Sequence, residues 1–286
     1  MSGKRMDGPY SAGWDIIHSC DYRCPYCFFI PSWTTDAEAT NARHLVVSKE
    51  EWLRFWDLCY KAAGSFQIEI AGGEPFRHPD LVPIVQGIAR RHSVRIVTNL
   101  SVAPALILDH LDPKTVCFSV SFHPQFASAE VLAEKLRRLA VAGFPTAASI
   151  VAYPPYFPEL AGWLGILESA GVRCYLNPFQ GVWEGARYPQ SYTMGEVELL
   201  RRHAFAAEPA VRLAERSPRG RLCAAGRRYF RIWPDGTIYR CCAATELGLK
   251  PLGHVRDGKV PLSAADAPCP AERCFAPNEV VHLSPG

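Results

Sequence analysis

The sequence predicts an α/β fold built on a parallel sheet, followed by a smaller cysteine-rich region. Two observations carry this prediction. Short β-rich apolar runs alternate with longer amphipathic runs through the first two hundred residues, and the alternation then stops near residue 208. Strands and helices in alternation form parallel strand pairs with right-handed crossovers. An open sheet and a barrel both satisfy this pattern, so periodicity leaves the closure of the sheet undecided.

Six expected strands share short runs of β-branched and aromatic residues, at residues 13–18, 66–72, 94–99, 115–122, 145–153 and 172–179. Apolar residues at helical spacing lie between and after them, at residues 48–64, 78–92, 103–111, 128–143, 156–171 and 193–207. Ser48 and Ser128 stand where helix N-caps are expected, and Gly64, Gly143 and Gly171 stand where helices end. We therefore expect an N-terminal extension over residues 1–12, a β/α region over residues 13–208 and a separate tail over residues 209–286.

The composition limits the classes of protein to consider. The chain has 286 residues, of which 48% are hydrophobic and 21% charged, which is enough to bury a large core. The net charge of +3 and the lack of a basic stripe argue against a nucleic-acid partner. No apolar run approaches the ~20 residues that span a bilayer, and the N-terminal residues do not resemble a signal peptide. We therefore expect a cytoplasmic protein without a membrane partner, whose eleven cysteines indicate metal or redox chemistry in preference to disulfides.

Three of these cysteines, Cys20, Cys24 and Cys27, directly follow the first expected strand in "CDYRCPYC". Loops at the carboxyl ends of parallel strands are where such folds place their active sites. Three thiolates can bind three corners of a cubic iron–sulfur cluster and leave the fourth iron open to a non-protein ligand. A zinc site completed by a fourth residue from elsewhere, or free structural cysteines, are the alternatives. Structural zinc favours two-residue spacing on both sides, and only Cys24 and Cys27 have it.

A second motif, "AGGEPF" at residues 71–76, ends the second expected strand. The CxxxCxxC motif precedes it, and each of the two motifs stands at the end of an expected strand. With both motifs in this order, the sequence resembles the radical S-adenosylmethionine (radical SAM) superfamily. The resemblance covers residues from about 13 to 180. It implies a partial (β/α)6 TIM-like barrel in place of an open sheet.

The resemblance also implies roles for individual residues. Cys20, Cys24 and Cys27 would ligate a [4Fe-4S] cluster whose fourth iron binds the amino and carboxylate groups of S-adenosylmethionine. Gly72 and Gly73 would let the backbone approach that amino acid, Glu74 would accept a hydrogen bond from its ammonium, and Pro75 would fix the turn. Tyr26, Ser119, Ser121 and the stretch at 150–151 would border the adenine and ribose, although a Ser-x-Ser strand is also an ordinary polar face. One electron from an external donor such as flavodoxin or ferredoxin would then yield a 5′-deoxyadenosyl radical that abstracts hydrogen from the substrate.

The tail carries a second resemblance. Residues 223–241, "CAAGRRYFRIWPDGTIYRC", contain a hairpin signal at Asp235-Gly236 and resemble the opening of the auxiliary-cluster domain called twitch in its short form and SPASM in its longer form. This implies a second [4Fe-4S] cluster on Cys223, Cys241, Cys269 and Cys274, with Cys241 preferred over the adjacent Cys242 on spacing. A zinc staple and a metal-free degenerate domain are the alternatives. Cys59, Cys117 and Cys174 lie in apolar patterns and are expected in the core.

The substrate depends on what lines the barrel mouth, for which we single out His123, Asn99, Asn177, Arg77, His78 and the aromatic loop 28–33. We expect oxidation or epimerisation of a small polar metabolite such as a sugar, aminocyclitol or nucleoside. The alternative is modification of a ribosomally made peptide, which the lack of an added peptide-binding module before Trp14 makes the second choice. A zinc-stapled, non-catalytic binding protein is a remote third, because a non-catalytic scaffold has no reason to keep both motifs.

Overall fold

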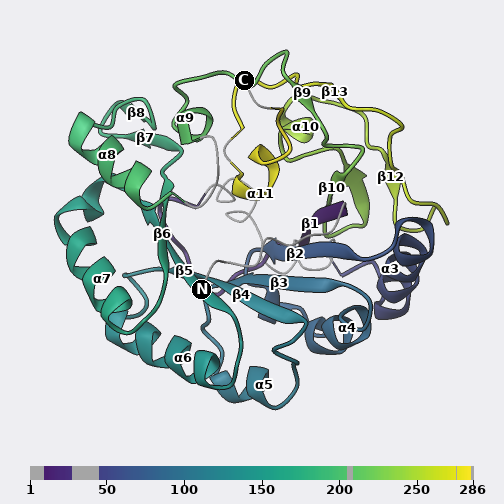
Figure 1. Ribbon diagram of the computed structural model, residues 1–286, viewed down its shortest axis with the longest axis horizontal. Coiled ribbons are helices and arrows are strands. Elements are labelled where there is room, and N and C mark those ends of the chain that lie inside the picture. Colours follow the sequence, from purple (N-terminus) through teal and green to yellow (C-terminus); the bar gives the residue numbers. More distant parts are fainter. Residues whose placement is uncertain (1–9, 28–44, 205–208, 275, 285–286) are drawn as a thin grey trace.

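The computed structural model describes residues 10–27, 45–204, 209–274 and 276–284. Its centre is a parallel sheet in which each strand lies beside the next in sequence: β1 (Tyr10–Ile17), β2 (Phe66–Gly72), β3 (Ser93–Thr98), β4 (Val116–Phe122), β5 (Thr146–Ala152) and β6 (Cys174–Pro178). The helices form an arc outside the strands (Figure 1) and are α3 (Lys49–Ala63), α4 (Leu81–Ile88), α5 (Pro104–Leu108), α6 (Ala129–Val141), α7 (Phe157–Ser169) and α8 (Met194–Arg202). The predicted α/β fold with six parallel strands in a partial barrel is confirmed.

The predicted helix caps explain where the helices start. Ser48 Oγ accepts a hydrogen bond from the Glu51 amide at 3.2 Å, and the Glu51 carboxylate accepts one from the Ser48 amide at 2.8 Å. This reciprocal pair satisfies two amides that have no partner inside the helix. Ser128 Oγ caps α6 in the same way through the Val131 amide at 3.3 Å. The helix predicted at 78–92 is shorter than expected, since α4 spans only Leu81–Ile88; a separate 3-10 turn, η1 (Pro75–Arg77), precedes it.

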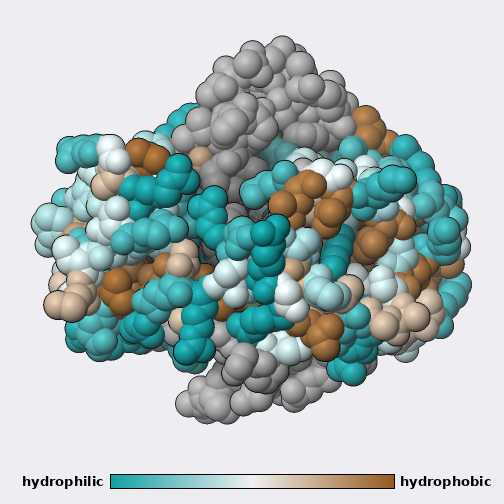
Figure 2. Space-filling model, turned by 90° about the horizontal axis from the view of Figure 1, so that it is seen from above, coloured by the Kyte–Doolittle hydropathy of each residue, from teal (hydrophilic) through white to brown (hydrophobic). Residues whose placement is uncertain are grey.

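The hydrophobic core lies between the strands and the helical arc. Alternate residues of β2, β3 and β4 are buried, as the two-residue period of a strand requires. Trp14 of β1 packs against Trp52 and Trp56 of α3, with ring centroids 4.5 and 5.7 Å apart. On the face shown in Figure 2, the hydrophobic residues are scattered among hydrophilic ones. Within the described residues, no helix is long and apolar enough to cross a membrane.

The tail extends the barrel sheet. The predicted hairpin forms as β10 (Tyr229–Ile232) and β11 (Thr237–Tyr239), and β10 runs parallel to β1 with Trp14 opposite Ile232. With β12 (Gly253–His254), nine strands of the described chain form one sheet in the order β12-β11-β10-β1-β2-β3-β4-β5-β6. The first strand begins at Tyr10 rather than residue 13. The hydrogen bonding of this sheet therefore crosses from the β/α region into the tail.

The remaining elements are short. After β6, the chain forms a ribbon of β7 (Gly181–Trp183) and β8 (Ala186–Tyr188). In the tail, β9 (Leu222–Cys223) pairs with β13 (Ala267–Pro268). Three single-turn helices complete the tail: α9 (Pro209–Arg212), α10 (Ala243–Glu246) and α11 (Pro277–Val280). Figure 1 shows α11 lying above the strand ends of the barrel, so the tail reaches the mouth of the barrel.

Candidate active site

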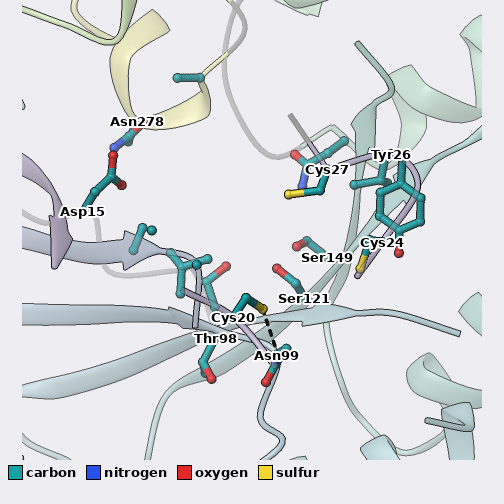
Figure 3. A pocket seen from close by; sticks show the side chains of 18 of the residues that line it. Asp15, Cys20, Cys24, Tyr26, Cys27, Thr98, Asn99, Ser121, Ser149 and Asn278 are labelled. Atoms are coloured by element: carbon teal, nitrogen blue, oxygen red, sulfur yellow. Dashed lines mark hydrogen bonds between the residues drawn. The ribbon is translucent and has the colours of Figure 1, made fainter. Parts of the chain in front are cut away.

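A cavity of about 330 Å³ opens at the carboxyl ends of the parallel strands (Figure 3). The motif cysteines Cys20, Cys24 and Cys27 all line it, as do Tyr26, Gly72, Gly73, Ser119 and Ser121. Of the further candidates, Asn99, His123, Asn177 and Val151 line it, whereas Arg77 and His78 do not. The aromatic loop 28–33 lies outside the described residues. The structure therefore brings residues from distant parts of the sequence to one space, where parallel sheets place their active sites.

The glycine pair fixes the loop that carries the cysteines. The Gly73 amide donates to the Ile17 carbonyl at 2.8 Å, and the Glu74 amide donates to the Ser19 carbonyl at 2.9 Å. A Cβ at residue 72 would lie 2.1 Å from the Ile17 oxygen, and a Cβ at residue 73 would lie 2.1 Å from the Ser19 oxygen. Only glycine permits this approach. The turn after β2 thus packs directly on the backbone that leads into the cysteine motif, and contact of the same glycines with a cosubstrate stays a prediction.

Glu74 lies behind the cavity wall. Its side chain is 1% exposed and is not among the residues that line the cavity. The carboxylate accepts hydrogen bonds from Thr98 Oγ1 at 2.7 Å, from the Asn99 amide at 2.7 Å and from the Phe76 amide at 3.1 Å. Burial raises the pKa of Glu74 to about 7, although these three donors favour the charged form. The observed contacts join the end of β2 to the end of β3 and to η1, where Pro75 is buried, so ammonium binding by Glu74 stays a prediction.

The motif thiols contact polar residues from neighbouring strands. Cys20 Sγ lies 3.4 Å from the Tyr22 amide and 3.8 Å from Asn99 Nδ2, and Cys24 Sγ lies 3.2 Å from His123 Nδ1. Burial raises the pKa of Cys20 to about 12 and that of Cys24 to about 11. These thiols therefore keep their protons until a nearby cation compensates the charge.

The donor set fits an iron–sulfur cluster. Each thiolate of a cubic cluster binds a different iron, so the three sulfurs need to border one space and need not meet at one point. Cys20, Cys24 and Cys27 do border one cavity, as Figure 3 shows. In the described part of the chain, no three His, Cys, Asp or Glu side chains converge as the ligands of a single metal ion would. The role of the three cysteines as cluster ligands stays a prediction.

Aromatic and hydroxyl side chains form the wall on the β4 and β5 side. Tyr26 stacks on His123 with ring centroids 5.9 Å apart, and its hydroxyl lies 2.8 Å from His123 Nδ1. Burial lowers the pKa of His123 to about 4, so the ring is neutral and can accept this hydrogen bond. Ser119 and Ser121 share the wall with Ser149 of β5, a residue that the sequence analysis missed. This wall offers a ring face and several hydroxyls, which suits the predicted adenine and ribose contacts.

A buried charged network, also missed from the sequence, forms the opposite wall. Arg231 of β10 donates to both Asp15 oxygens at 2.8 Å, and its guanidinium lies 3.6 Å from Glu279 of α11. Burial alone would raise the pKa of Asp15, but the Arg231 charge and a hydrogen bond with His18 hold it below its ordinary value. A Cβ at Gly13 would lie 2.5 Å from the Tyr229 hydroxyl, so only glycine leaves room here. A signal was available in "GWDIIH", where Asp15 interrupts an apolar strand.

The four tail cysteines chosen from the sequence gather in one place. Cys223 and Cys269 are buried in a small hydrophobic cluster, and Cys241 and Cys274 pack against it. The pKa of Cys274 is raised mainly by burial and, to a smaller extent, by the charges of Glu279 and of the other three cysteines. The Arg240 guanidinium supports the same region by donating to the carbonyls of Cys223, Ala267 and Pro268 at 3.3, 2.7 and 3.3 Å. Four thiols at one small hydrophobic cluster fit the predicted auxiliary cluster, and their ligand role stays a prediction.

The cysteines outside both motifs separate into two kinds. Cys59 and Cys174 are buried in the main core as expected, and Cys117 is half-buried beside Arg95. Cys242 differs from its neighbour Cys241, because it lines the barrel cavity. Its amide and its sulfur both donate to the Glu279 carboxylate, the sulfur at 2.9 Å.

No protein-family model matches the chain. One stretch of 86 residues, 30% of this chain, is 29% identical to the PqqA peptide cyclase of Ruegeria pomeroyi and covers 20% of that protein. Among solved structures, Streptococcus suis SuiB bound to the precursor peptide SuiA aligns with a TM-score of 0.61 at 13% identity, over 88% of this chain and 63% of SuiB. The structure of anSMEcpe with bound AdoMet aligns with a TM-score of 0.60 at 12% identity, over 87% of this chain and 79% of that one.

These likenesses define a class of protein. The chain has the fold of radical SAM enzymes, and the resemblance that its cysteine and glycine motifs carry is confirmed at the level of the fold. It spans less than two thirds of SuiB and about a fifth of the curated relative.

Proposed function

We propose that this chain is a radical SAM enzyme that modifies a ribosomally made peptide. The observation that carries the enzymatic part is the convergence of both sequence motifs on one cavity at the strand ends. Cys20, Cys24 and Cys27 would hold the [4Fe-4S] cluster, and the wall of Tyr26, Ser119 and Ser121 would receive the nucleoside of S-adenosylmethionine. When bound, these groups supply the one-electron chemistry that removes a hydrogen atom from the substrate. The protein positions the reactants and excludes water.

The peptide part replaces our first expectation of a small metabolite. The curated relative is a peptide cyclase, and one of the aligned structures is bound to a precursor peptide. These likenesses support the alternative that the sequence analysis ranked second. The cavity also suits an amino-acid residue, because Glu69 lines it with one sign of charge and Arg212 with the other. A peptide backbone presents donors and acceptors together and can use both.

Two further components complete the proposal. The gathered thiols of Cys223, Cys241, Cys269 and Cys274 would hold an auxiliary four-iron cluster in the tail. An external one-electron donor of the flavodoxin or ferredoxin type would reduce the first cluster.

The test measures iron and cosubstrate cleavage in the anaerobically reconstituted protein. Two clusters correspond to about eight irons per chain. Replacing Cys20, Cys24 and Cys27 together by alanine should remove about half of this iron and abolish release of 5′-deoxyadenosine from S-adenosylmethionine. Cleavage that persists in this triple variant would contradict the proposed site.

A second experiment addresses the substrate. Peptides encoded beside this gene should change in mass when incubated with the reduced enzyme and S-adenosylmethionine. Unchanged peptides together with a modified sugar or nucleoside would return the assignment to a small metabolite.

A further inference from the structure

Arg212 contributes a positive charge to the wall of the barrel cavity. It is the last residue of the single-turn helix α9 and is 5% exposed. It lines the cavity together with Asn177 of β6 and Gln180, which follows β6. Arginine side chains are seldom buried to this extent, so the position of this one needs a physical reason.

The residues on either side of Arg212 hold α9 in place. Val211 is buried in the small hydrophobic cluster of the tail, and Leu213 is buried in the main core. Gln180 Nε2 donates to the Arg212 carbonyl at 3.5 Å. Ala214 has a φ of 59°, which is uncommon for a residue with a Cβ and persists only where the surrounding structure imposes it. The backbone at Arg212 is therefore anchored from several sides.

The side chain of Arg212 has a polar partner in the cavity wall. Its Nη2 donates to Asn177 Oδ1 at 2.8 Å. Because the Asn177 oxygen is the acceptor of this bond, its Nδ2 group remains available as a donor. A guanidinium has five N–H donors in one plane, so it can hold Asn177 and also receive a planar group with two acceptor oxygens. A carboxylate has this shape.

The charges of the cavity wall favour an anion near Arg212. Asp15 Oδ1 lies 2.8 Å from Arg231 Nη2, and Glu69 Oε2 lies 3.4 Å from Arg95 Nη1, so each of these carboxylates is compensated locally. Burial lowers the pKa of Arg212 to about 10, because water that would stabilise its charge is excluded. The guanidinium is still charged at neutral pH. An anion in the cavity would stabilise this charge in place of water.

Arg212 lies where the barrel meets the tail. Asn177 belongs to β6, the strand that follows the predicted nucleoside wall on β4 and β5. On its other side, α9 contacts α11, which carries Asn278 of the opposite cavity wall. A group bound to Arg212 would therefore lie between the two walls. This is a place beside the predicted cosubstrate, where a substrate has to lie.

We propose that Arg212 and Asn177 form a subsite that binds a carboxylate of the peptide substrate. This inference rests on the proposed function and specifies the substrate further, as a peptide with an acidic side chain or a chain terminus near the reacting carbon. The two carboxylate oxygens accept hydrogen bonds from the guanidinium, and Asn177 Nδ2 donates to one of them. Arg212 determines specificity in this scheme.

The test measures the binding of three alanine-based pentapeptides to the reconstituted enzyme with S-adenosylmethionine bound. The first has a central glutamate and blocked ends, the second has a central glutamine and blocked ends, and the third has a central glutamine and a free terminal carboxylate. Anaerobic titration calorimetry without reductant gives the dissociation constants. We expect a peptide with a carboxylate to bind about ten- to a hundredfold more tightly than the neutral one. Whether this is the first or the third peptide distinguishes a side chain from a terminus.

Three variants complete the experiment. Arg212→Gln should remove the preference, and Arg212→Lys, which keeps the charge without the planar fork, should retain part of it. Arg137→Gln is the matched control, because Arg137 is exposed on α6 and paired with Glu134, and it should keep the wild-type preference.

Several results would overturn the inference. They are equal dissociation constants for the three peptides with wild type, no binding of any peptide, and a preference that persists in Arg212→Gln. Weaker binding of S-adenosylmethionine by Arg212→Gln would assign the guanidinium to the cosubstrate and would overturn it as well. A wild type that releases no 5′-deoxyadenosine under reducing conditions would instead overturn the proposed function.

Discussion

Glu74 offers a test of how the glycine-rich turn is held. Its pKa rises from 4.5 to about 7 in the folded protein because the side chain is buried, while three hydrogen bonds oppose this rise. At about 1.4 kcal/mol for each pH unit, this difference corresponds to ~3 kcal/mol. The folded state therefore binds the Glu74 proton more tightly than the unfolded state between these two pH values. The resulting contribution to stability is fully present below pH 4.5 and is lost as the pH rises through about 7.

Glu74→Gln removes this titration and keeps the shape of the side chain. We expect the free energy of unfolding of wild type, measured relative to the variant, to fall by ~3 kcal/mol from below pH 4.5 to above pH 7. Urea unfolding followed by tryptophan fluorescence, with both proteins loaded with iron to the same extent, measures this difference. Glu134→Gln is the matched control, because that carboxylate is exposed and paired with Arg137 on the surface of α6. A wild-type-to-Glu74→Gln difference that stays constant across the range would refute the reasoning.

Three more predictions concern packing and ligation. Gly73→Ala places a Cβ 2.1 Å from the Ser19 oxygen and should destabilise the protein by about 1–3 kcal/mol in thermal unfolding, with loss of iron from the first site. Gly162→Ala in α7 meets nothing within 4 Å and should be neutral or stabilising by up to ~1 kcal/mol; equal effects of the two variants would contradict the packing argument. The Phe179 amide donates to the Tyr192 hydroxyl at 2.8 Å, so Tyr192→Phe leaves this amide without its partner and should lower the free energy of unfolding by about 1–3 kcal/mol. Tyr60 is exposed, and Tyr60→Phe should change the free energy of unfolding by less than about 0.5 kcal/mol. Cys241→Ala should lower the iron content by up to about four per chain, and retention of all iron would show that the tail site does not use this residue.

The barrel could be predicted from the sequence because the patterns that indicate its strands and helices are local. A serine three residues before a glutamate predicts the start of α3, and apolar periodicity predicts the strands and helices that bury one face. The position of the cysteine motif followed from the rule that parallel strands end at the same edge of a sheet. Each of these signals lies within a window of a few residues, so pairing over long distances was not needed to read them.

The cavity wall formed by Asp15, Arg231 and Glu279 could not be predicted in this way. The register of β10 against β1 pairs residues more than two hundred positions apart, and β10 has only four residues. Without that register, nothing in the sequence joins Asp15 to Arg231 or Glu279. The same is true of Glu74, for which the motif resemblance implied a contact with the cosubstrate ammonium, while its observed partners Thr98 and Asn99 lie at the end of the next strand. Polar side chains whose hydrogen-bond partners are distant in the sequence leave no recognisable pattern in the residues around them.

The parallel pairing of β10 with β1 also has a consequence for how the protein is made. A ribosome releases β1 first, and its partner on one side, β2, follows within about sixty residues. The other side of β1 stays open until residues 229–232 have emerged, about two hundred residues after β1. Until then, a nascent chain carries an uncovered strand edge, which is a hazard for association with other chains. Completion of the barrel, and with it the cavity wall contributed by Arg231, Cys242 and Asn278, must wait until residues 229–278 have left the ribosome.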